Sequence, residues 1–382
     1  MSTLQSCHAH GQSIWLDFIR RQLIASGELG RLIDQDGIRG VTSNPAIFEK
    51  AIGGSSDYDA ALAAAVAAGQ SDPEQLFEHL AIEDIRAAAD VLAGLYRDSD
   101  GVDGYVSLEV SPHLAMDLDA TVANARRLWR AVDRPNLMIK VPATEPGIAA
   151  VRVLIGEGIN VNVTLLFARA AYRAVAQAYL EGLETLAAAG GELRSVASVA
   201  SFFVSRIDTA IDAMIDERLA DTSAEQGSQL AALRGRIAVA NAKMAYQDFL
   251  EIEASPRWQR LAAQGARPQR LLWASTGTKN PAYSDVLYVE TLIGRDTVNT
   301  VPPATMDAFR DHGSVADTLT EGVAEAREQL EQLAAFGLSL DQVAAQLLGD
   351  GVQLFVDAHE KLLGAVARKA DTLRAAAVDP AR

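Results

Sequence analysis

Short apolar runs rich in β-branched residues alternate along the chain with longer segments in which apolar residues recur every three or four positions. The short runs predict strands, and the segments between them, such as residues 119–132 and 169–190, predict helices. The predicted strands cover residues 14–18, 37–43, 105–110, 137–143, 159–167, 196–204, 271–276 and 297–302. Strict alternation of strand and helix indicates a parallel sheet, and eight strands are the number that closes a barrel. We therefore predict an α/β protein with a (β/α)8 TIM barrel.

The spacing of the predicted strands is uneven, which indicates additional helices. About 60 residues separate the second and third strands, and they include an alanine-rich stretch (59–70) and a helix beginning near Asp72-Pro73. Residues 205–265 hold more than one helix, and the chain is helical after Pro303, with a helix start near 337–341. Since no repeat or low-complexity linker divides the chain, we predict one domain over residues 1–382. Residues 1–13 form an N-terminal tail in this interpretation, and residues 314–382 form a helical C-terminal extension.

Charge and cysteine content narrow the class of protein. The net charge of −16 argues against a surface for nucleic acid or for an anionic membrane. The single cysteine, Cys7, allows no intramolecular disulfide and fits a reducing cytosol. The first residues lack the basic start and apolar core of a secretory signal, and no apolar run approaches the roughly 20 residues of a membrane span. We expect a cytoplasmic protein that binds neither nucleic acid nor membrane.

Polar residues gather near the ends of the predicted strands. In a parallel barrel the active site lies where strands end and the following loops begin. The polar residues in these places are Asp17, Thr42, Ser43, Asn44, Glu109, Lys140, Asn162, Thr164, Ser201, Arg206, Ser275 and Lys279. Their concentration at one end of seven successive strands predicts an active site there.

Lys140 is the sharpest single signal, because apolar residues flank it on both sides in the run 137–141. Burial disfavours an ammonium ion, and a neutral amine can attack a carbonyl to form a Schiff base. A strand lysine taken alone more often points to solvent or protects a sheet edge. A closed barrel has no edge, however, and Lys140 shares its rim with carboxylates. We therefore favour a role for Lys140 as the nucleophile.

Asp17 and Glu109 are candidate proton carriers. Aldol chemistry through a Schiff base needs a base that takes a proton from the substrate hydroxyl as the C–C bond breaks. It also needs acid–base help to form and hydrolyse the carbinolamine. Either carboxylate alone is better explained as a structural ion pair or a helix cap. Together with Lys140 they favour a catalytic role.

Arg206 and Lys279, with Ser201 and Ser275 nearby, are candidates for binding a phosphate. Barrels often bind phosphate after the seventh and eighth strands, which supports Lys279 more than Arg206. The alternative for each residue is a solvated cation at the start of a helix.

Other motif searches give no candidate, so we predict neither a metal nor another cofactor. The six histidines (8, 10, 79, 113, 312 and 359) show no metal-ligand spacing beyond His8-Ala-His10, in a terminus expected to be frayed. The chain has no Gly-rich dinucleotide or P-loop motif and no Gly-x-Ser-x-Gly elbow.

Six short motifs, in order along the chain, closely resemble those of transaldolases, in particular the longer bacterial branch of that family. They are GVTSNPAIFEKAI (40–52), SLEVSP (107–112), LMIKVPAT (137–144), GINVNVTLLF (158–167), SFFVSRID (201–208) and ASTGTKNP (274–281). The resemblance extends from about residue 14 to residue 309.

The resemblance implies a role for most of the candidate residues. Lys140 would form the Schiff base, Asp17 would shuttle the proton during C–C cleavage and formation, and Glu109 with Thr164 would position a catalytic water. The remaining implied contacts are to the substrate: Asn44 and Asn162 to hydroxyls of a dihydroxyacetone unit, Ser201 to the substrate, and Arg206 to its phosphate. Lys279 stands, shifted by one residue, where many members have a second arginine, and a lysine binds phosphate as a point charge instead of a fork.

The implied reaction transfers a dihydroxyacetone unit from sedoheptulose 7-phosphate or fructose 6-phosphate to glyceraldehyde 3-phosphate or erythrose 4-phosphate. This is a transferase step of carbohydrate metabolism, in the non-oxidative pentose phosphate pathway. Two alternatives stay open: an aldolase that releases free dihydroxyacetone, and a non-catalytic barrel that binds sugar phosphates. Related shorter aldolases tend to lack the carboxylate at the position of Glu109, which favours the transferase. We expect small-molecule sugar phosphates as partners, and a monomer or homodimer.

Overall fold

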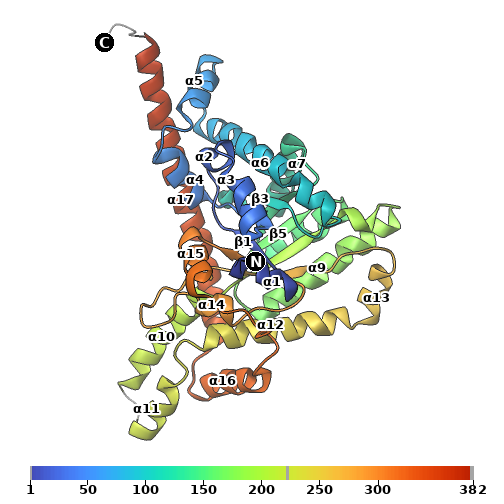
Figure 1. The fold of residues 1–382 in the computed structure, drawn as a ribbon, viewed down its shortest axis with the longest axis vertical. Helices are drawn as coiled ribbons and strands as arrows, with labels where there is room; N and C mark the ends of the chain where they lie inside the picture. Colours follow the sequence, from blue (N-terminus) through green and yellow to red (C-terminus); the bar gives the residue numbers. More distant parts are fainter. Residues whose placement is uncertain (1, 221–222, 379–382) are drawn as a thin grey trace.

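Eight parallel strands, paired in chain order, form a closed barrel at the centre of the molecule (Figure 1). The computed structural model describes residues 2–220 and 223–378, of which 376–378 by their backbone only. The strands are β1 (Gln12–Leu16), β2 (Gly40–Val41), β3 (Tyr105–Glu109), β4 (Leu137–Pro142), β5 (Val161–Leu166), β6 (Ser198–Phe203), β7 (Arg270–Ala274) and β8 (Thr297–Val301). All eight predicted strands and the predicted (β/α)8 TIM barrel are confirmed.

The barrel closes between its first and last strands. β1 pairs with β8 along its whole length, from Gln12 opposite Thr297 to Leu16 opposite Val301. β2 is much shorter than the predicted run 37–43. Glycine at position 40 allows the backbone of β2 to lie close against Trp15. A Cβ atom at this position would lie 2.5 Å from Cδ2 of Trp15. Trp15 is fully buried, so a large side chain fills the space beside the short strand.

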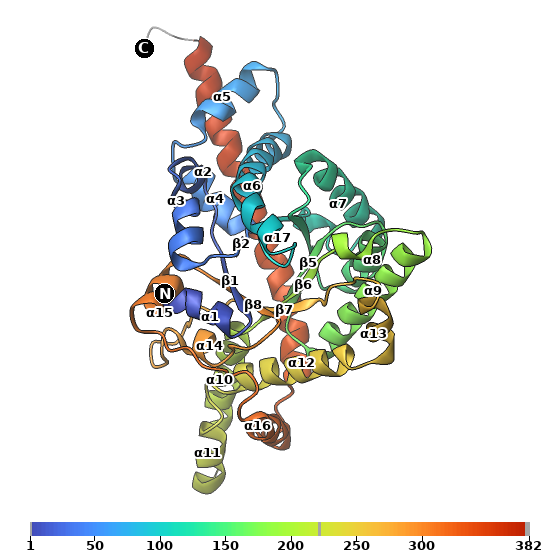
Figure 2. The same ribbon diagram turned by 45° about the vertical axis from the view of Figure 1, so that its right-hand side comes forward.

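Helices surround the barrel and extend beyond it (Figures 1 and 2). Those before β5 are α1 (Thr3–Ala9), α2 (Arg21–Ala25), α3 (Glu28–Arg31), the π-helix η1 (Leu32–Asp36), α4 (Pro45–Gly53), α5 (Asp59–Ala67), α6 (Pro73–Asp98), the 3-10 helix η2 (Pro112–Leu114), α7 (Leu118–Val132) and α8 (Glu145–Gly156). Those after it are α9 (Arg169–Ala188), the 3-10 helix η3 (Leu193–Ser195), α10 (Ser205–Leu219), α11 (Ala224–Ala231), α12 (Ile237–Glu253), α13 (Pro256–Ala262), α14 (Leu287–Glu290), α15 (Pro303–His312), α16 (Val323–Ala335) and α17 (Leu340–Val378).

The inserted helices lie where the uneven strand spacing predicts them. α4, α5 and α6 fill the long interval between β2 and β3. The carboxylate of Asp72 caps α6, because it accepts hydrogen bonds from the backbone N–H groups of Glu74 (2.8 Å) and Gln75 (3.2 Å). Several helices also occupy residues 205–265, as expected.

The N-terminal residues form a packed helix instead of the expected frayed tail. Ser2 and Gln5 make a capping box at the start of α1, and Leu4 and Cys7 are buried. β1 already begins at Gln12. A seven-residue helix is too short for a clear periodic signal, and its stability comes from these buried contacts.

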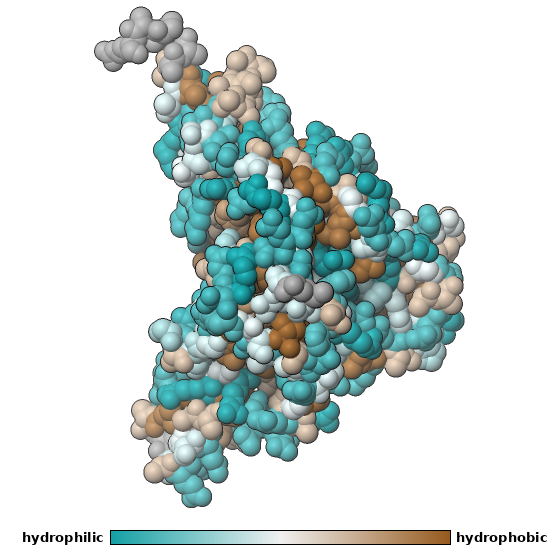
Figure 3. Space-filling view, viewed as in Figure 1, coloured by the Kyte–Doolittle hydropathy of each residue, from teal (hydrophilic) through white to brown (hydrophobic). Residues whose placement is uncertain are grey.

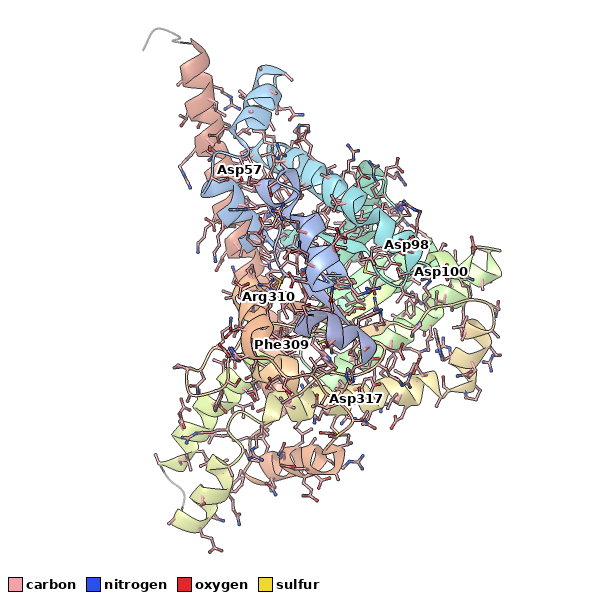
Figure 4. The ribbon with its side chains drawn as sticks, viewed as in Figure 1. Asp57, Asp98, Asp100, Phe309, Arg310 and Asp317 are labelled. Atoms are coloured by element: carbon pink, nitrogen blue, oxygen red, sulfur yellow. The ribbon has the colours of Figure 1, made fainter. Side chains whose placement is uncertain are left out.

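Charged pairs connect N-terminal segments to the region after β8. Arg310 in α15, labelled in Figure 4, donates hydrogen bonds to both carboxylate oxygens of Asp36 in η1 (3.0 Å each). His10 Nδ1 lies 2.8 Å from Oδ1 of Asp317, which is also labelled there.

The face in Figure 3 is mainly hydrophilic, with scattered apolar patches. No helix in the described part of the chain is long and apolar enough to span a membrane.

The last helix, α17, runs along one side of the barrel and past its mouth (Figures 1 and 2). It packs against α4, α5, α6 and α10, and it also contacts β5. Lys369 anchors its later part, because its Nζ donates to Oδ1 of Asp59 at 2.7 Å. The helix begins within the predicted window, and its contacts with β5 bring residues of the 350s to the strand ends where polar residues gather.

Candidate active site

Strand register brings three of the predicted site residues together. Glu109 is the register partner of Lys140 across β3 and β4, and Lys140 is that of Asn162 across β4 and β5. Pro142 is likewise paired with Thr164. Neighbouring strands lie about 4.8 Å apart, so register partners place their side chains close to each other. The pairing of three successive strands thus builds the centre of the site.

Lys140 is buried at this centre, with only 6% of its surface exposed. Its Nζ donates a hydrogen bond to the carbonyl oxygen of Ser43 (2.7 Å) and forms an ion pair with Oε1 of Glu109. Neither Glu109 oxygen has a hydrogen bond of ordinary geometry to a described residue, and the same holds for Oγ1 of Thr164. Burial raises the pKa of Glu109 above its usual range, against the attraction of the Lys140 charge. A carboxylate with a raised pKa accepts a proton more readily, here from an ammonium group in contact with it.

Asp17 follows β1 directly, and hydrogen bonds hold its backbone and its side chain. Its N–H donates to the carbonyl oxygen of Val301 (2.8 Å), across the closure of the barrel. Oγ1 of Thr42 donates to its Oδ1 (2.7 Å) and also lies 2.7 Å from Oγ1 of Thr300. Burial raises the pKa of Asp17, while the charges of Lys140 and Lys279 act in the opposite direction. The site therefore holds a second carboxylate whose pKa favours proton uptake.

A chain of hydrogen bonds across β3, β5 and β6 orients Asn162. The Nδ2 of Asn162 donates to Oγ of Ser107 (3.1 Å), and its Oδ1 accepts from Oγ of Ser201 (2.7 Å). All three residues are buried. These partners hold the side-chain amide in one orientation, so that it presents a fixed pattern of donors and acceptors beside Lys140.

Asn44 has a structural contact of its own. It is the N-cap of α4, where its Oδ1 accepts from the N–H of Ile47 (2.9 Å) and Pro45 occupies the first helical position. Asn44 also lines a cavity together with Ser43 and Glu109. Asn44 therefore lies at the rim of the site, and its side-chain oxygen Oδ1 is hydrogen-bonded to the first turn of α4.

The predicted phosphate-binding residues lie on the β6 and β7 side of the mouth. Arg206, at the start of α10, is half-buried, and its guanidinium carbon lies 5.3 Å from the centre of the Phe203 ring. Burial lowers its pKa. Oγ of Ser275 lies 3.0 Å from Oγ of Ser205, which joins the ends of the two strands. These residues stand apart from the hydrogen bonds around Lys140.

Lys279 is exposed in the loop after β7. It lines a cleft of about 270 Å3 together with Asp208 and Asp212 of α10. Both carboxylates accept hydrogen bonds from tyrosines, Asp208 from Tyr288 (2.8 Å) and Asp212 from Tyr283 (2.7 Å). Lys279 thus stands at the outer edge of the site, beside acidic groups.

Several residues that complete the site were not among the candidates. They are Ser107 and Thr300, whose hydroxyls contact Asn162 and Thr42. Ser43 was among the polar residues at the predicted strand ends, and it is its backbone carbonyl oxygen that accepts from Lys140. Ser107 has a signal in the sequence, because it precedes Glu109 by two residues and so lies on the same side of its strand.

No local feature of the sequence predicts that α17 contributes residues to the active site. Val352 and Phe355 line a small cavity of about 10 Å3 together with Lys140, Glu109 and Thr164. His359 lines a second cavity that also reaches Glu109. The last helix therefore covers the site that the barrel strands build.

A strained turn in β5 meets this helix. Leu165, directly after Thr164, has a φ of 63° at an irregularity in the pairing of β5 with β6. A Cβ atom on Gly351 of α17 would lie 2.9 Å from Cδ2 of Leu165. Glycine at position 351 thus permits the close approach of the helix to the strand.

The described residues contain no group of three or more His, Cys, Asp or Glu side chains arranged to hold a metal ion. The groups at the centre of the site are instead one amine, two carboxylates and neutral hydroxyl and amide side chains.

The fold is that of a (β/α)8 barrel, with polar residues from several strands and a buried lysine at its mouth. A sequence model of the family described as Transaldolase/Fructose-6-phosphate aldolase matches residues 14–366. The chain belongs to this family.

Similar proteins cover almost the whole chain. It is 50% identical over 356 residues to a transaldolase of Thiobacillus denitrificans, spanning 93% of this chain and 97% of that protein. It is 48% identical over 366 residues to a transaldolase of Trichodesmium erythraeum (95% and 96%). A transaldolase of Thermobifida fusca is 48% identical over 369 residues (96% and 98%). The resemblance seen in the short motifs thus extends over the full barrel and most of α17.

Proposed function

We propose that this protein is a transaldolase that transfers a dihydroxyacetone unit between sugar phosphates through a Schiff base on Lys140. The buried contact between Lys140 and Glu109, in a site shared with Asp17, carries the proposal. A buried ion pair is a weak source of stability, whereas an amine beside a proton acceptor is what attack on a carbonyl requires.

Schiff-base formation starts with proton transfer from the Lys140 ammonium to Glu109. The neutral amine adds to the C2 carbonyl of the ketose phosphate, and a proton moves from nitrogen to oxygen to give the carbinolamine. Glu109 then returns its proton to the leaving hydroxyl, so that ammonium and ketone become a protonated imine and one water. The unpartnered hydroxyl of Thr164, which lines the same small cavity, supports a role in orienting that water.

Cleavage of the C3–C4 bond needs a base at the C4 hydroxyl. Asp17 takes this proton, the bonding electrons pass into the iminium to form an enamine, and an aldose phosphate leaves. An acceptor aldose phosphate then reacts in the reverse direction, and Asp17 returns the proton to the new hydroxyl. The raised pKa of Asp17 suits a group that accepts a proton in one half-reaction and returns it in the other.

The other candidates hold the substrate. Asn44, Asn162 and Ser201 contact hydroxyls of the three-carbon unit, and Arg206, Lys279 and Ser275 bind the phosphate. Arg206 offers a planar fork of donors and Lys279 a point charge. The position of Lys279 beside Asp208 and Asp212 makes it the weaker of the two anchors.

The proposal is tested by borohydride reduction in the presence of fructose 6-phosphate. We expect a covalent three-carbon or six-carbon adduct on the peptide that contains Lys140, located by mass spectrometry, and no adduct in Lys140→Ala. An unmodified Lys140, or an adduct on another lysine, would contradict the proposal.

The second candidate is an aldolase, which the name of the matched family also includes. A transferase needs erythrose 4-phosphate to turn over with fructose 6-phosphate, while an aldolase releases free dihydroxyacetone without an acceptor. We expect product formation to depend on the acceptor. Absence of turnover with any ketose and acceptor pair would favour the non-catalytic barrel.

The proposal also covers the location, oligomeric state, partners and pathway of the enzyme. We propose a cytoplasmic monomer or homodimer that binds sugar phosphates and no nucleic acid, within the non-oxidative pentose phosphate pathway. We propose one domain, in which the described helices after residue 314 form an extension that reaches the mouth of the barrel. The net charge of −16 and the packing of α17 support these points.

A further inference from the structure

A second cavity is lined by Glu109, and Lys140 is not among its lining residues. It has a volume of about 30 Å3 and extends from Ser43 and Glu109 at the barrel mouth to Glu74 of α6 and His359 of α17. One water needs about 10–15 Å3, so the cavity has room for about two water molecules. Glu109 lines both this cavity and the smaller one that contains Lys140 and Thr164. The carboxylate thus stands between two compartments.

Polar atoms face this cavity from both ends without an adequate protein partner. His359 is 3% exposed, and its Nε2 lies 3.4 Å from Oε1 of Glu74, a charge contact without hydrogen-bond geometry to any described residue. At the other end, Oε1 of Glu109 is in contact with Lys140, while Oε2 has no hydrogen-bond partner among the described residues. An unpaired buried polar group costs about 1–3 kcal/mol, and buried water is the usual partner of such groups.

The walls between these ends are mostly apolar, and they hold the imidazole in place. Phe48, Phe77, Ala81 and Ile82 line the middle of the cavity. The rings of Phe77 and His113 each have their centres 5.7 Å from that of His359, in edge-to-face geometry. The polar residues Asn44, Glu78 and Ser111 also line the cavity and offer further contacts to water.

The charge state of His359 suits contact with water. Burial lowers its pKa, and the neighbouring His113 acts in the same direction, while Glu74 and Glu78 of α6 raise it. A neutral imidazole has one donor and one acceptor nitrogen, so it can bind a water in either orientation.

We propose that this cavity stores the water of the Schiff-base reaction, with His359 as the positioning residue at its far end. The inference rests on the proposed roles of Lys140 and Glu109. The water released when the carbinolamine dehydrates passes Glu109 and is held between Glu109 and His359. The same compartment returns a water, which adds to the imine carbon and releases the product from Lys140.

The need for such a compartment follows from the roof over the site. Val352 and Phe355 of α17 line the small cavity around Lys140. In the proposed complex, the substrate would fill the remaining open side of the barrel mouth. Water must nevertheless leave after imine formation and return for hydrolysis, while the three-carbon unit stays bound. A second space lined by Glu109 permits this exchange without opening the site.

The test separates C–C bond formation from hydrolysis in a single turnover. Enzyme that carries the three-carbon unit is mixed with erythrose 4-phosphate and quenched with borohydride at successive times. The change of the Lys140 adduct from three to seven carbons measures bond formation, and free sedoheptulose 7-phosphate measures hydrolysis.

We expect His359→Phe to slow hydrolysis about tenfold, the effect of losing one buried polar contact, and to change bond formation less than twofold. Ala81→Leu, which fills the cavity from α6 without touching His359, should have the same effect. His359→Gln restores a polar end and should hydrolyse within about threefold of the parent enzyme.

Several outcomes would overturn the inference. They are unchanged hydrolysis in both His359→Phe and Ala81→Leu, equal slowing of both steps, and a His359→Gln variant as slow as His359→Phe. Equal slowing would indicate that His359 only holds α17 in place. If the parent enzyme forms no adduct on Lys140, the proposed function itself has failed, and this result differs from every outcome that concerns His359 alone.

A crystal structure of the parent enzyme should show ordered water between Glu109 and His359, and a side chain filling that space would contradict the inference.

Discussion

The two ends of the barrel both hold buried charges, but in opposite arrangements. At the end away from the site, Asp103 accepts hydrogen bonds from Nε of Arg39 (2.6 Å), Oγ of Ser13 (3.0 Å) and Nη2 of Arg270 (3.1 Å). These contacts hold the pKa of Asp103 below its usual range, although burial acts in the opposite direction. At the mouth, Asp17 and Glu109 share Lys140, and burial raises the pKa of both carboxyls.

The two ends differ in the ratio of carboxylates to cations and in how many of their polar atoms have hydrogen-bond partners. One carboxylate between two guanidiniums is neutralised and fully hydrogen-bonded, which makes a rigid structural contact. Two carboxylates near one amine leave net negative charge in a buried place, and Oε2 of Glu109 has no hydrogen-bond partner among the described residues. Such a cluster costs stability and favours proton transfer, as expected of a reactive site. Substitutions at the two ends should therefore separate activity from stability.

The largest effect is expected for Lys140→Ala, which removes the nucleophile. The kcat should fall by about 10^4-fold or more, because no other described lysine lies within the buried part of the site. The unfolding free energy should fall less than in Asp103→Asn, because Glu109 loses its counter-charge but can take up a proton. Steady-state assays with fructose 6-phosphate and erythrose 4-phosphate, together with chemical denaturation, measure both. Retention of more than a hundredth of the activity would exclude Lys140 as the nucleophile.

Asp17→Asn should lower kcat by about 10^2- to 10^4-fold, because the proton carrier is lost. The same change should stabilise the fold by about 1 kcal/mol at neutral pH. Since the folded state raises the pKa of Asp17, its ionised form costs stability above that pKa. The gain should therefore shrink as the pH falls toward the unfolded value of about 3.9. Urea titrations at several pH values measure this, and a loss of stability at neutral pH would contradict the comparison.

Asp103→Asn should have the opposite outcome at the other end of the barrel. We expect a loss of about 3 kcal/mol in unfolding free energy, because the buried guanidinium of Arg270 and the half-buried one of Arg39 lose their counter-charge. The pKa of Asp103 is lowered in the fold, so this contribution is present above about pH 3.9 and is lost as the pH falls through the lowered value. The folded fraction should keep its kcat. A normal midpoint with impaired kcat would show that the two ends do not divide these tasks.

The smallest effect is expected for Asp100→Asn, a matched control at an exposed ion pair with Arg194. Asp100 is labelled in Figure 4 and has a left-handed φ of 55°, which asparagine also tolerates. Unfolding free energy should change by less than about 0.5 kcal/mol, and kcat should not change. A loss comparable to that of Asp103→Asn would mean that burial is not what distinguishes these carboxylates.

Local pattern was sufficient for the strands and for the chemistry at their ends. The eight short runs predicted the barrel, because alternation with helices leaves a parallel sheet as the only simple arrangement. Lys140 and Glu109 could be placed near each other, since carboxyl ends of barrel strands share one rim. The boundaries of β2 and the packed α1 escaped prediction, because they depend on the contact of Gly40 with Trp15 and on the burial of Leu4 and Cys7.

The sequence by itself determined the class of fold, the nucleophile candidate and the family, since each rests on short segments with their own periodicity or motif. The tertiary structure alone decided which groups surround that nucleophile. The register of β3, β4 and β5 puts Glu109 and Asn162 beside Lys140. The path of α17 then brings His359 to a cavity that it shares with Glu109. Contacts between such distant parts of the chain depend on how the closed barrel and its last helix pack, and local periodicity carries no information about that packing.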